Sequence, residues 1–445
     1  MGWQPLPELA VELDRLLRTA QRERRIPSVS AAVFRDGEII WSDALGLADV
    51  ETGEGATPDH AYRIGSITKT FTAVCVMQLR DAGQVDLGAP LRTYIPEVPP
   101  GPTVQQALAH LSGFQREPPG EIWETLTPPS REELLAGLED AEQVLAPGTV
   151  WHYSNLAFSL LGELVVRVSE SDYPEYLETK VLEPLGLSRT ALRPIDPVAR
   201  GYDVGPWSDE AKREPDLELT ETTAALGQLW STTADLALWG SFLAAGHKDV
   251  LPQATLDEMT RVQAIVDNAA WTIGWGLGLT LYRRGDRVFT GHGGAMPGYL
   301  AGLVVDRSER TGAVVLAGAS TGARTEELAL DLAGAALDLA EPDVGVWQPD
   351  AGAPDDLAPL LGTWWVEGNE HVIRYRTGRL EVELVGGPAG RSVSVLTQEE
   401  PGRFRIVEGR EQGELVRVVR DAGGPIVKLY FATYPMTREP SSFRP

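Results

Sequence analysis

The sequence predicts an α+β fold in which helices flank an antiparallel sheet, a helical insertion interrupts the sheet, and a small all-β domain follows. Two strand-like runs near the start, 28–34 and 38–45, enclose Asp36-Gly37, a dipeptide typical of hairpin turns. Strand patterns then return only after residue 272. Strands separated by so long an insertion can complete one sheet only by pairing across it, so we expect distant pieces of the chain to lie side by side.

The remaining elements of this first part follow from local patterns. Charged and apolar residues in 1–26 predict an amphipathic helix, and a second helix is expected from Ser66 to about Gly83. Residues 84–229 are expected to be mostly helical, with proline-containing loops. Thr232 or Thr233 suits an N-cap. Strands and a last helix are then expected at 272–282, 288–290, 299–305, 313–319 and 324–339.

A chain of 445 residues exceeds the usual size of one compact domain. We expect a first domain over 1–340, a linker over 341–356 that is rich in Pro, Gly and Asp, and a second domain over 357–445. Five alternating runs predict strands in the second domain, at 372–375, 380–384, 404–407, 415–419 and 426–431. A small barrel is favoured, and a sandwich remains the alternative.

Composition excludes several classes of function. The net charge of −25 argues against binding to nucleic acid or to an anionic membrane. The single cysteine, Cys75, rules out an internal disulfide framework and lies in an apolar stretch typical of a core. No apolar segment has the length of a membrane span, and residues 1–26 lack the apolar region of a signal peptide, so a cytoplasmic location is expected.

Lys69 is the most informative residue of the chain. It is one of five lysines and the only one with a serine, Ser66, three residues before it. Arginine keeps its proton at working pH, whereas a buried lysine can lose it. Positions i and i+3 share a helix face, so this spacing predicts a nucleophile beside a base. At a helix start, Ser66 would also lie near N–H groups that stabilise negative charge.

Two further motifs follow in order, Tyr153-Ser154-Asn155 and His292-Gly293-Gly294. Together with Ser66-x-x-Lys69, they resemble the serine β-lactamase and penicillin-binding-protein superfamily over roughly residues 5–340, and most closely its class C branch with esterases and D-amino-acid peptidases. The resemblance implies a β-lactamase/transpeptidase-like fold. The run Leu361-Gly362-Thr363-Trp364 is similar to the start of lipocalin-like barrels.

This resemblance implies acyl transfer, with Ser66 as the nucleophile and with Lys69 and Tyr153 sharing the base and acid steps. It leaves open which of these two is the principal base. Backbone N–H groups of Ser66 and Ala295 would hold the oxyanion.

The other motif residues receive supporting roles from the resemblance. Asn155 would bind a substrate amide or help to place Lys69. His292 would line the strand side of the site and assist Tyr153, with Gly293 and Gly294 beside it. Because a histidine stands where many β-lactamases carry lysine, hydrolysis of β-lactams is disfavoured.

We therefore expect a serine hydrolase that acts on a small ester, amide or short peptide, without a metal or an organic cofactor. One alternative is a D-amino-acid peptidase or amidase. Another is an acyltransferase similar to the penicillin-binding-protein-type thioesterases that release and cyclise peptides. A binding module without catalysis is disfavoured by the intact Ser66, Lys69 and Tyr153. The sequence fixes neither the substrate, nor the role of the second domain, nor the oligomeric state.

Overall fold

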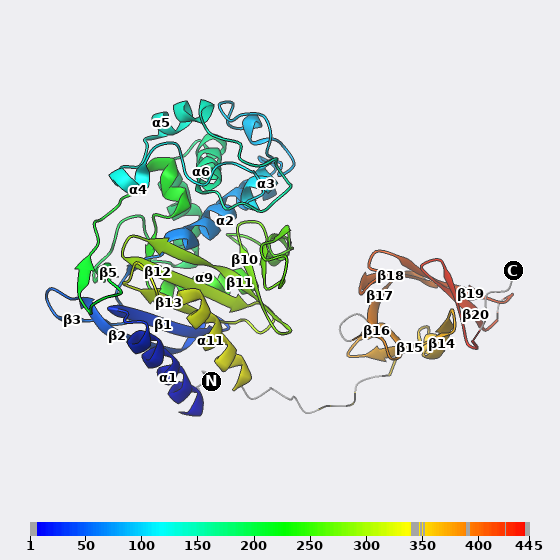
Figure 1. Cartoon of the computed structure of the whole chain (residues 1–445). Coiled ribbons are helices and arrows are strands. Elements are labelled where there is room, and N and C mark those ends of the chain that lie inside the picture. Colours follow the sequence, from blue (N-terminus) through cyan, green and yellow to red (C-terminus); the bar gives the residue numbers. More distant parts are fainter. Residues whose placement is uncertain are drawn as a thin grey trace. The chain divides into compact units, whose positions relative to one another are not determined.

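The computed structural model describes residues 7–339, 347, 349, 352–388, 392–422 and 424–440. The chain divides into two compact units, Met1–Glu341 and Pro342–Pro445 (Figure 1). Much of the predicted linker 341–356 lies outside the described residues.

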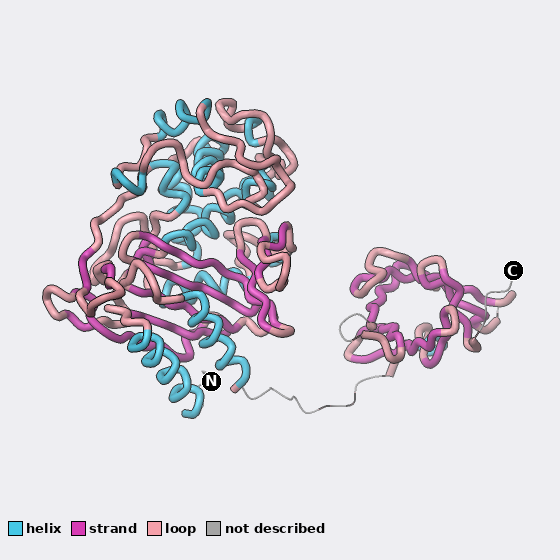
Figure 2. The backbone as a smooth tube through the Cα atoms, viewed as in Figure 1, coloured by secondary structure: helices cyan, strands magenta, loops and turns pink. Residues whose placement is uncertain are grey.

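An antiparallel sheet of nine strands forms the centre of the first unit (Figure 2). In spatial order, its strands are β3 (Glu54–Gly55), β2 (Glu38–Asp49), β1 (Ser28–Arg35), β13 (Thr311–Ala317), β12 (Tyr299–Asp306), β11 (Arg287–Met296), β10 (Thr280–Arg284), β9 (Ile273–Trp275) and β8 (Ala264–Ile265). The hairpin β1–β2 pairs through β1 with β13, near the other end of the unit. The predicted sheet, completed by distant pieces of chain, is confirmed.

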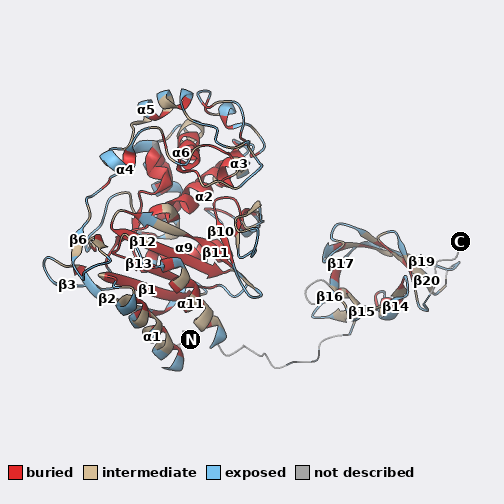
Figure 3. Ribbon diagram, viewed as in Figure 1, coloured by how far each residue is buried: buried red, intermediate tan, exposed pale blue. Residues whose placement is uncertain are grey.

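Helices cover both faces of this sheet, which is why β13 is buried along its whole length. Val315 belongs to an apolar cluster with Leu13 and Leu332, whereas its neighbour Val314 belongs to the opposite cluster with Phe71. Figure 3 shows the buried strands of the sheet between the helices that cover its two faces. The side chains of successive strand residues point to opposite faces, so one strand supplies both cores.

The helices are α1 (Pro7–Glu23), α2 (Thr68–Asp81), α3 (Val104–Leu108), α4 (Ile122–Thr125), α5 (Arg131–Ala136), α6 (Asn155–Ser169), α7 (Tyr173–Leu177), α8 (Glu183–Leu185), α9 (Thr233–Ala245), α10 (Gln253–Met259) and α11 (Thr325–Asp338). The expected N-cap is confirmed, since Thr232 accepts a hydrogen bond from the Asp235 amide. None of the helices in the described parts of the chain has the length and apolarity that crossing a membrane requires.

The insertion is less purely helical than expected. It begins after β4 (Tyr62–Arg63), which pairs with β7 (Trp230–Ser231) where the insertion ends. Between them the chain also forms a short hairpin, β5 (Tyr202–Val204) and β6 (Ala211–Arg213).

Two expected strands differ from the structure. The single strand predicted at 272–282 is a hairpin of β9 and β10, whose turn includes Gly278 at φ +73°. The strand predicted at 288–290 extends through 287–296 as β11. Glycines at 291, 293 and 294 made this run look like a loop, because glycine is depleted in strands. Here they lie where other backbone or side-chain atoms approach the strand closely.

The second unit contains a closed antiparallel barrel of eight strands, as the favoured interpretation predicted. Its strands are β14 (Gly362–Val366), β15 (Asn369–Arg376), β16 (Arg379–Leu384), β17 (Val393–Glu400), β18 (Arg403–Glu408), β19 (Leu415–Arg420), β20 (Ile426–Phe431) and β21 (Tyr434–Thr437). Trp364 is fully buried and donates its indole hydrogen bond to the Leu360 carbonyl at 2.6 Å. The Arg438 guanidinium lies 3.8 Å from the centre of a Trp364 ring.

The two units are expected to fold independently, because each apolar cluster lies wholly within one of them. A chain that ends at Glu341 should unfold cooperatively within about 5 °C of the corresponding transition of the full chain, since a change of 1 kcal/mol shifts the melting temperature of a large domain by only about 2–4 °C. Scanning calorimetry of both chains measures this difference. Aggregation of the shortened chain, or loss of its transition, would contradict the expectation.

Candidate functional site

The three sequence motifs meet at one cavity of about 910 Å³ in the first unit. Seven of the eight predicted site residues line it: Ser66, Tyr153, Asn155, His292, Gly293, Gly294 and Ala295. They come from a 3₁₀ turn before α2, from the start of α6 and from β11. The eighth residue, Lys69, is fully buried beside Ser66.

Ser66 and Lys69 lie on consecutive turns of chain. Ser66 is in the 3₁₀ turn η1 (Gly65–Ile67), and Lys69 is in the first turn of α2. Lys69 Nζ donates to Ser66 Oγ at 2.9 Å and to the Leu226 carbonyl at 2.6 Å. The predicted pair is therefore in direct contact, at a distance suited to proton transfer.

Burial changes the acidity of this lysine. It lowers the pKa of Lys69 to about 7, an effect that the negative charge of Glu117 opposes and the positive charge of Arg116 reinforces. Both hydrogen-bond acceptors of Nζ, a hydroxyl and a carbonyl, are uncharged, so neither offsets the lost hydration of an ammonium ion as a carboxylate would. Lys69 can thus exist as a neutral amine near neutral pH.

The pKa of Tyr153 is shifted in the opposite direction to that of Lys69. Burial raises the pKa of the Tyr153 phenol, and the nearby Ser66 hydroxyl only partly offsets this. Its ring lies among aromatic side chains, with centroid distances of 4.2 Å to His110 and 5.9 Å to Trp275. Tyr153 therefore stays protonated at neutral pH and can act as a hydrogen-bond donor or an acid.

The middle residue of the second motif fixes the local backbone. Ser154 Oγ accepts from the Ala157 amide at 3.1 Å, which caps α6, and donates to the Gln115 carbonyl at 2.8 Å. The Ser154 amide donates to His110 Nδ1 at 3.1 Å. Burial holds the pKa of His110 well below its usual value, so this ring nitrogen remains an acceptor. Tyr153 and Asn155 are thereby held on either side of a fixed residue.

Asn155 contacts an acidic residue that the sequence analysis missed. Its Nδ2 donates to both carboxylate oxygens of Glu117, at 2.8 and 2.9 Å. The hydrogen bonds of Lys69 go to Ser66 and Leu226 instead. Asn155 Oδ1 is buried without a hydrogen-bond partner among the described residues, so it is available to a substrate N–H.

His292 lies on β11 and is buried. Burial, reinforced by the charge of Lys69, lowers the pKa of His292 to about 3, so the ring is neutral near pH 7. Its Nδ1 donates to the Gly293 carbonyl at 2.5 Å, which leaves Nε2 as an acceptor. The centroids of the His292 and Tyr153 rings are 6.4 Å apart.

Close backbone contacts bring β11 against the turn that carries Ser66. A Cβ atom at Gly294 would lie 1.9 Å from the Ile64 carbonyl oxygen, and one at Gly65 would lie 2.6 Å from the Ala295 nitrogen. Glycine at both positions removes these clashes. The backbone of Ala295 is therefore next to the turn of Ser66, as an oxyanion site made of their two N–H groups requires.

The rest of the cavity wall is largely aromatic. Trp123, Trp151, Trp275 and Tyr282 line it, and none of them belongs to the three sequence motifs. In the described parts of the chain, no three His, Cys, Asp or Glu side chains are grouped so that they could hold a metal ion.

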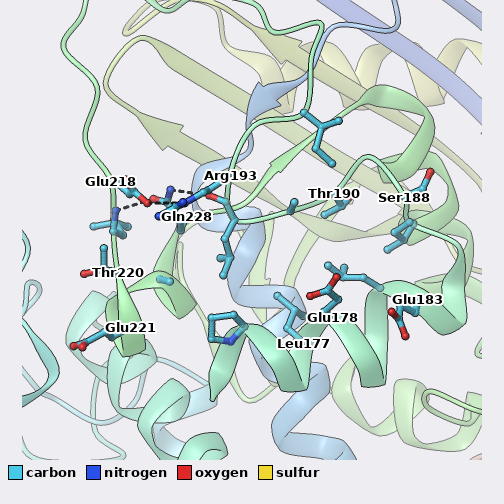
Figure 4. Close-up of a pocket in the computed structure, with 18 of the residues that line it drawn as sticks. Leu177, Glu178, Glu183, Ser188, Thr190, Arg193, Glu218, Thr220, Glu221 and Gln228 are labelled. Carbon is cyan, nitrogen blue, oxygen red and sulfur yellow. Dashed lines mark hydrogen bonds and ion pairs between the residues drawn. The ribbon is translucent and has the colours of Figure 1, made fainter. Parts of the chain in front are cut away.

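A second cavity, of about 700 Å³, contains none of the predicted site residues (Figure 4). Arg193, Glu218 and Gln228 lie close together in it, and Arg193 forms an ion pair with Glu218 at 3.4 Å. Ala224 contributes to its wall, whereas Leu226, two residues further on, lines the motif cavity. The turn η5 (Glu221–Leu226) thus borders both cavities.

The arrangement of fold and motifs agrees with comparison to known proteins. Residues 13–338 match the family described as Beta-lactamase, so the chain belongs to the beta-lactamase family. The expected β-lactamase/transpeptidase-like fold is confirmed. Residues 353–438, which include the barrel strands, match a family described as a domain of unknown function, DUF7586.

Two curated relatives illustrate the range of the family. Esterase EstB of Burkholderia gladioli is 33% identical over 198 residues, which cover 40% of this chain and 50% of the esterase. Penicillin-binding protein 4 of Amycolatopsis lactamdurans is 28% identical over 370 residues, which cover 78% of this chain and 95% of that protein. Several other curated relatives are matched over only about half to two thirds of their length.

Two solved structures share the fold. The octameric penicillin-binding protein homologue from Pyrococcus abyssi superposes with a TM-score of 0.66 at 23% identity, over 96% of this chain and 99% of that one. A D-stereospecific amidohydrolase from Streptomyces sp. has a TM-score of 0.62 at 26% identity, over 72% of this chain and 97% of that one.

Gly294→Ala tests the contact between β11 and the turn of Ser66. Because the added Cβ meets the Ile64 carbonyl oxygen, the variant should be destabilised by about 1–3 kcal/mol, the usual cost of overpacking. Denaturant unfolding measures the difference. Gly334→Ala, in α11 with open space around the added atom, is the matched control and should be neutral or stabilising by up to about 1 kcal/mol. Equal stability of the two variants would show that the close contact is not a constraint.

Proposed function

We propose that this chain is a serine hydrolase that cleaves small esters or amides through an acyl-enzyme on Ser66. One observation carries the proposal: a fully buried lysine, with its pKa lowered to about 7, lies 2.9 Å from the Ser66 hydroxyl. Such a lysine can remove a proton from serine near neutral pH, which a permanently charged group could not.

In the first half of the reaction, neutral Lys69 accepts the Ser66 proton as Oγ attacks the substrate carbonyl. The negative charge that develops on the carbonyl oxygen is stabilised by the N–H groups of Ser66 and Ala295. A donor of this kind typically contributes about 3 kcal/mol to the transition state. Lys69 becomes an ammonium ion at this stage.

In the second half, Tyr153 donates its proton to the leaving alkoxide or amine, and Lys69 returns a proton to Tyr153. The raised pKa of Tyr153 suits this role, because the phenol is protonated when the leaving group departs. Water then attacks the acyl-enzyme, and neutral Lys69 accepts its proton. As the bond between the acyl carbon and Ser66 Oγ breaks, Lys69 returns this proton to Oγ, and the carboxylic acid is released. This assignment makes Lys69 the principal base and Tyr153 the acid.

Similarity to an esterase and to a D-stereospecific amidohydrolase supports esters and amides as the substrate class. β-Lactams are expected to be poor substrates, because the neutral His292 supplies no cation on β11 for their carboxylate. A p-nitrophenyl acetate assay beside nitrocefin tests this class preference, and faster turnover of nitrocefin would favour a β-lactamase.

Ser66→Ala should abolish turnover of p-nitrophenyl esters and covalent labelling by a fluorophosphonate probe. Turnover and labelling should be lost because the variant lacks the only hydroxyl that is hydrogen-bonded to Lys69 Nζ among the described residues. Intact-protein mass spectrometry should show one probe adduct per wild-type chain and none on the variant. An adduct that persists on the variant would move the nucleophile to another residue.

The pH profile should report Lys69. Because the neutral amine is the active form, kcat/KM should rise about tenfold per pH unit below 7 and level off above it, with an apparent pKa of about 7. Measurement of kcat/KM between pH 5 and 9 records this rise, the acidic limb of the profile.

Two variants show which residue titrates in the acidic limb of this pH profile. His292→Gln should keep a limb near pH 7, since the pKa of His292 is about 3 and its ring is neutral throughout. Lys69→Arg should lower kcat by about two orders of magnitude or more. A limb that disappears in the His292 variant would assign the titration to the histidine instead.

A further inference from the structure

A carboxylate that the mechanism does not use lies at the edge of the active-site cavity. Glu326, in the first turn of α11, lines this cavity together with Ser66 and His292. A Cβ atom at Gly293 would lie 2.2 Å from the Glu326 carboxyl carbon and 2.5 and 2.6 Å from its two oxygens. The Glu326 carboxylate therefore occupies the space that a side chain at Gly293 would fill.

Paired glycines make this position possible. Gly293 on β11 is the cross-strand partner of Gly302 on β12. A Cβ atom at Gly302 would lie 2.7 Å from the Glu326 nitrogen and 2.7 Å from the Thr325 carbonyl carbon. The start of α11 thus packs directly on the sheet, and it brings Glu326 over the strand that also carries His292 and Ala295.

The hydrogen bonding of Glu326 leaves negative charge available to a ligand. The hydroxyl of the buried Tyr282 donates to Glu326 Oε1. Burial, together with the charge of Glu326, raises the pKa of Tyr282 well above its usual value, so Tyr282 remains a donor. A neutral donor positions the carboxylate without neutralising it.

The two arginines that line the cavity are paired with other carboxylates. Arg324 contacts Glu327 at 2.5 Å, and Arg116 contacts Glu117 at 3.5 Å. Among the ion pairs of the described residues, none involves Glu326, which is itself exposed. A buried or paired carboxylate would have a structural explanation, whereas this one faces the cavity.

We propose that Glu326 binds a positively charged amine of the substrate, so that the preferred substrates are esters or amides of amino acids or of other amine-bearing acids. This inference rests on the hydrolase function proposed above and names its substrate class. Gly293 and Ala295 are two residues apart on one strand, or about 7 Å. An ammonium group within a few bonds of the reacting carbonyl can therefore reach Glu326 while the carbonyl oxygen lies at Ala295.

The competing explanation is that Glu326 only stabilises the positive end of α11. The adjacent Glu327 provides the matched control, because it lies in the same helical turn but is not among the residues lining the active-site cavity, and it pairs with Arg24 and Arg324. Glu327→Gln removes one negative charge from the helix end and leaves the cavity intact. Glu326→Gln removes the cavity charge and keeps an oxygen that accepts from Tyr282.

The test uses two substrates with one carbon skeleton. D- and L-phenylalanine methyl esters and amides carry the ammonium group, and the methyl ester and amide of 3-phenylpropanoic acid lack it. At pH 7.0, kcat/KM of the wild-type chain should be at least about tenfold higher for the better amine substrate, equivalent to about 1.4 kcal/mol. Glu326→Gln should remove most of this preference and change kcat/KM for the deaminated substrates less than about twofold. Glu327→Gln should preserve the preference.

Each outcome distinguishes the two proposals. Turnover of the deaminated substrates with no preference for the amines, or an equal loss on both in Glu326→Gln, overturns the role of Glu326 and leaves the hydrolase intact. Absence of turnover on every substrate, together with absence of fluorophosphonate labelling at Ser66, overturns the hydrolase itself. If Glu326→Gln does not fold, inhibition of the wild-type chain decides: 2-phenylethylamine should inhibit at least about tenfold more strongly than the uncharged 2-phenylethanol. Equal inhibition by both compounds would overturn the proposal.

Discussion

The burial of Lys69 is the constraint on which the geometry of the candidate site depends. Removing an ammonium group from water is costly, and among the described residues the side chain retains only the Ser66 hydroxyl and the Leu226 carbonyl as hydrogen-bond partners. Leu226 ends the turn η5, and Thr72 on α2 donates to the neighbouring Ala225 carbonyl at 2.7 Å. This bond ties η5 to the helix of Lys69, so the environment that lowers the lysine pKa is part of the folded core rather than of a surface loop.

Strand β11 places the other groups relative to this lysine. On one side it is pressed against the turn of Ser66 through Gly294, and on the other it receives the start of α11 over Gly293. Glycine in the middle of a strand loses side-chain packing and backbone entropy. In return, these glycines let neighbouring groups approach the strand closely. One strand then carries the Ala295 N–H and the neutral ring of His292, and the Glu326 carboxylate lies over its Gly293. The glycines that weaken the strand are those that assemble the site.

How much of the fold and of the candidate site could be predicted depends on the distance in sequence between the interacting groups. Lys69 and Ser66 are one helical turn apart, so their contact follows from local geometry and was predicted correctly. The hairpin at Asp36-Gly37 and the cap at Thr232 were predictable for the same reason. Glu117 and Glu326 were missed, because their positions depend on long-range packing against Asn155 and Gly293, for which neither segment has a local signal. Strand β11 was predicted too short because its glycines are explained only by the neighbours they admit.

The charge of the substrate and the state of the base are coupled in such a cavity. The pKa of Lys69 already responds to Arg116, which lowers it, and to Glu117, which raises it. A bound ammonium group would act in the same direction as Arg116 and would favour the neutral amine that the proposed mechanism requires, whereas a bound carboxylate would favour the protonated form. With the pKa of Lys69 at about 7, even a small shift of this pKa changes the fraction of neutral Lys69 at neutral pH. Under the proposed mechanism, a carboxylate at position 326 and a neutral histidine at position 292 therefore favour the same substrates that keep Lys69 deprotonated, so binding preference and base strength would reinforce one another.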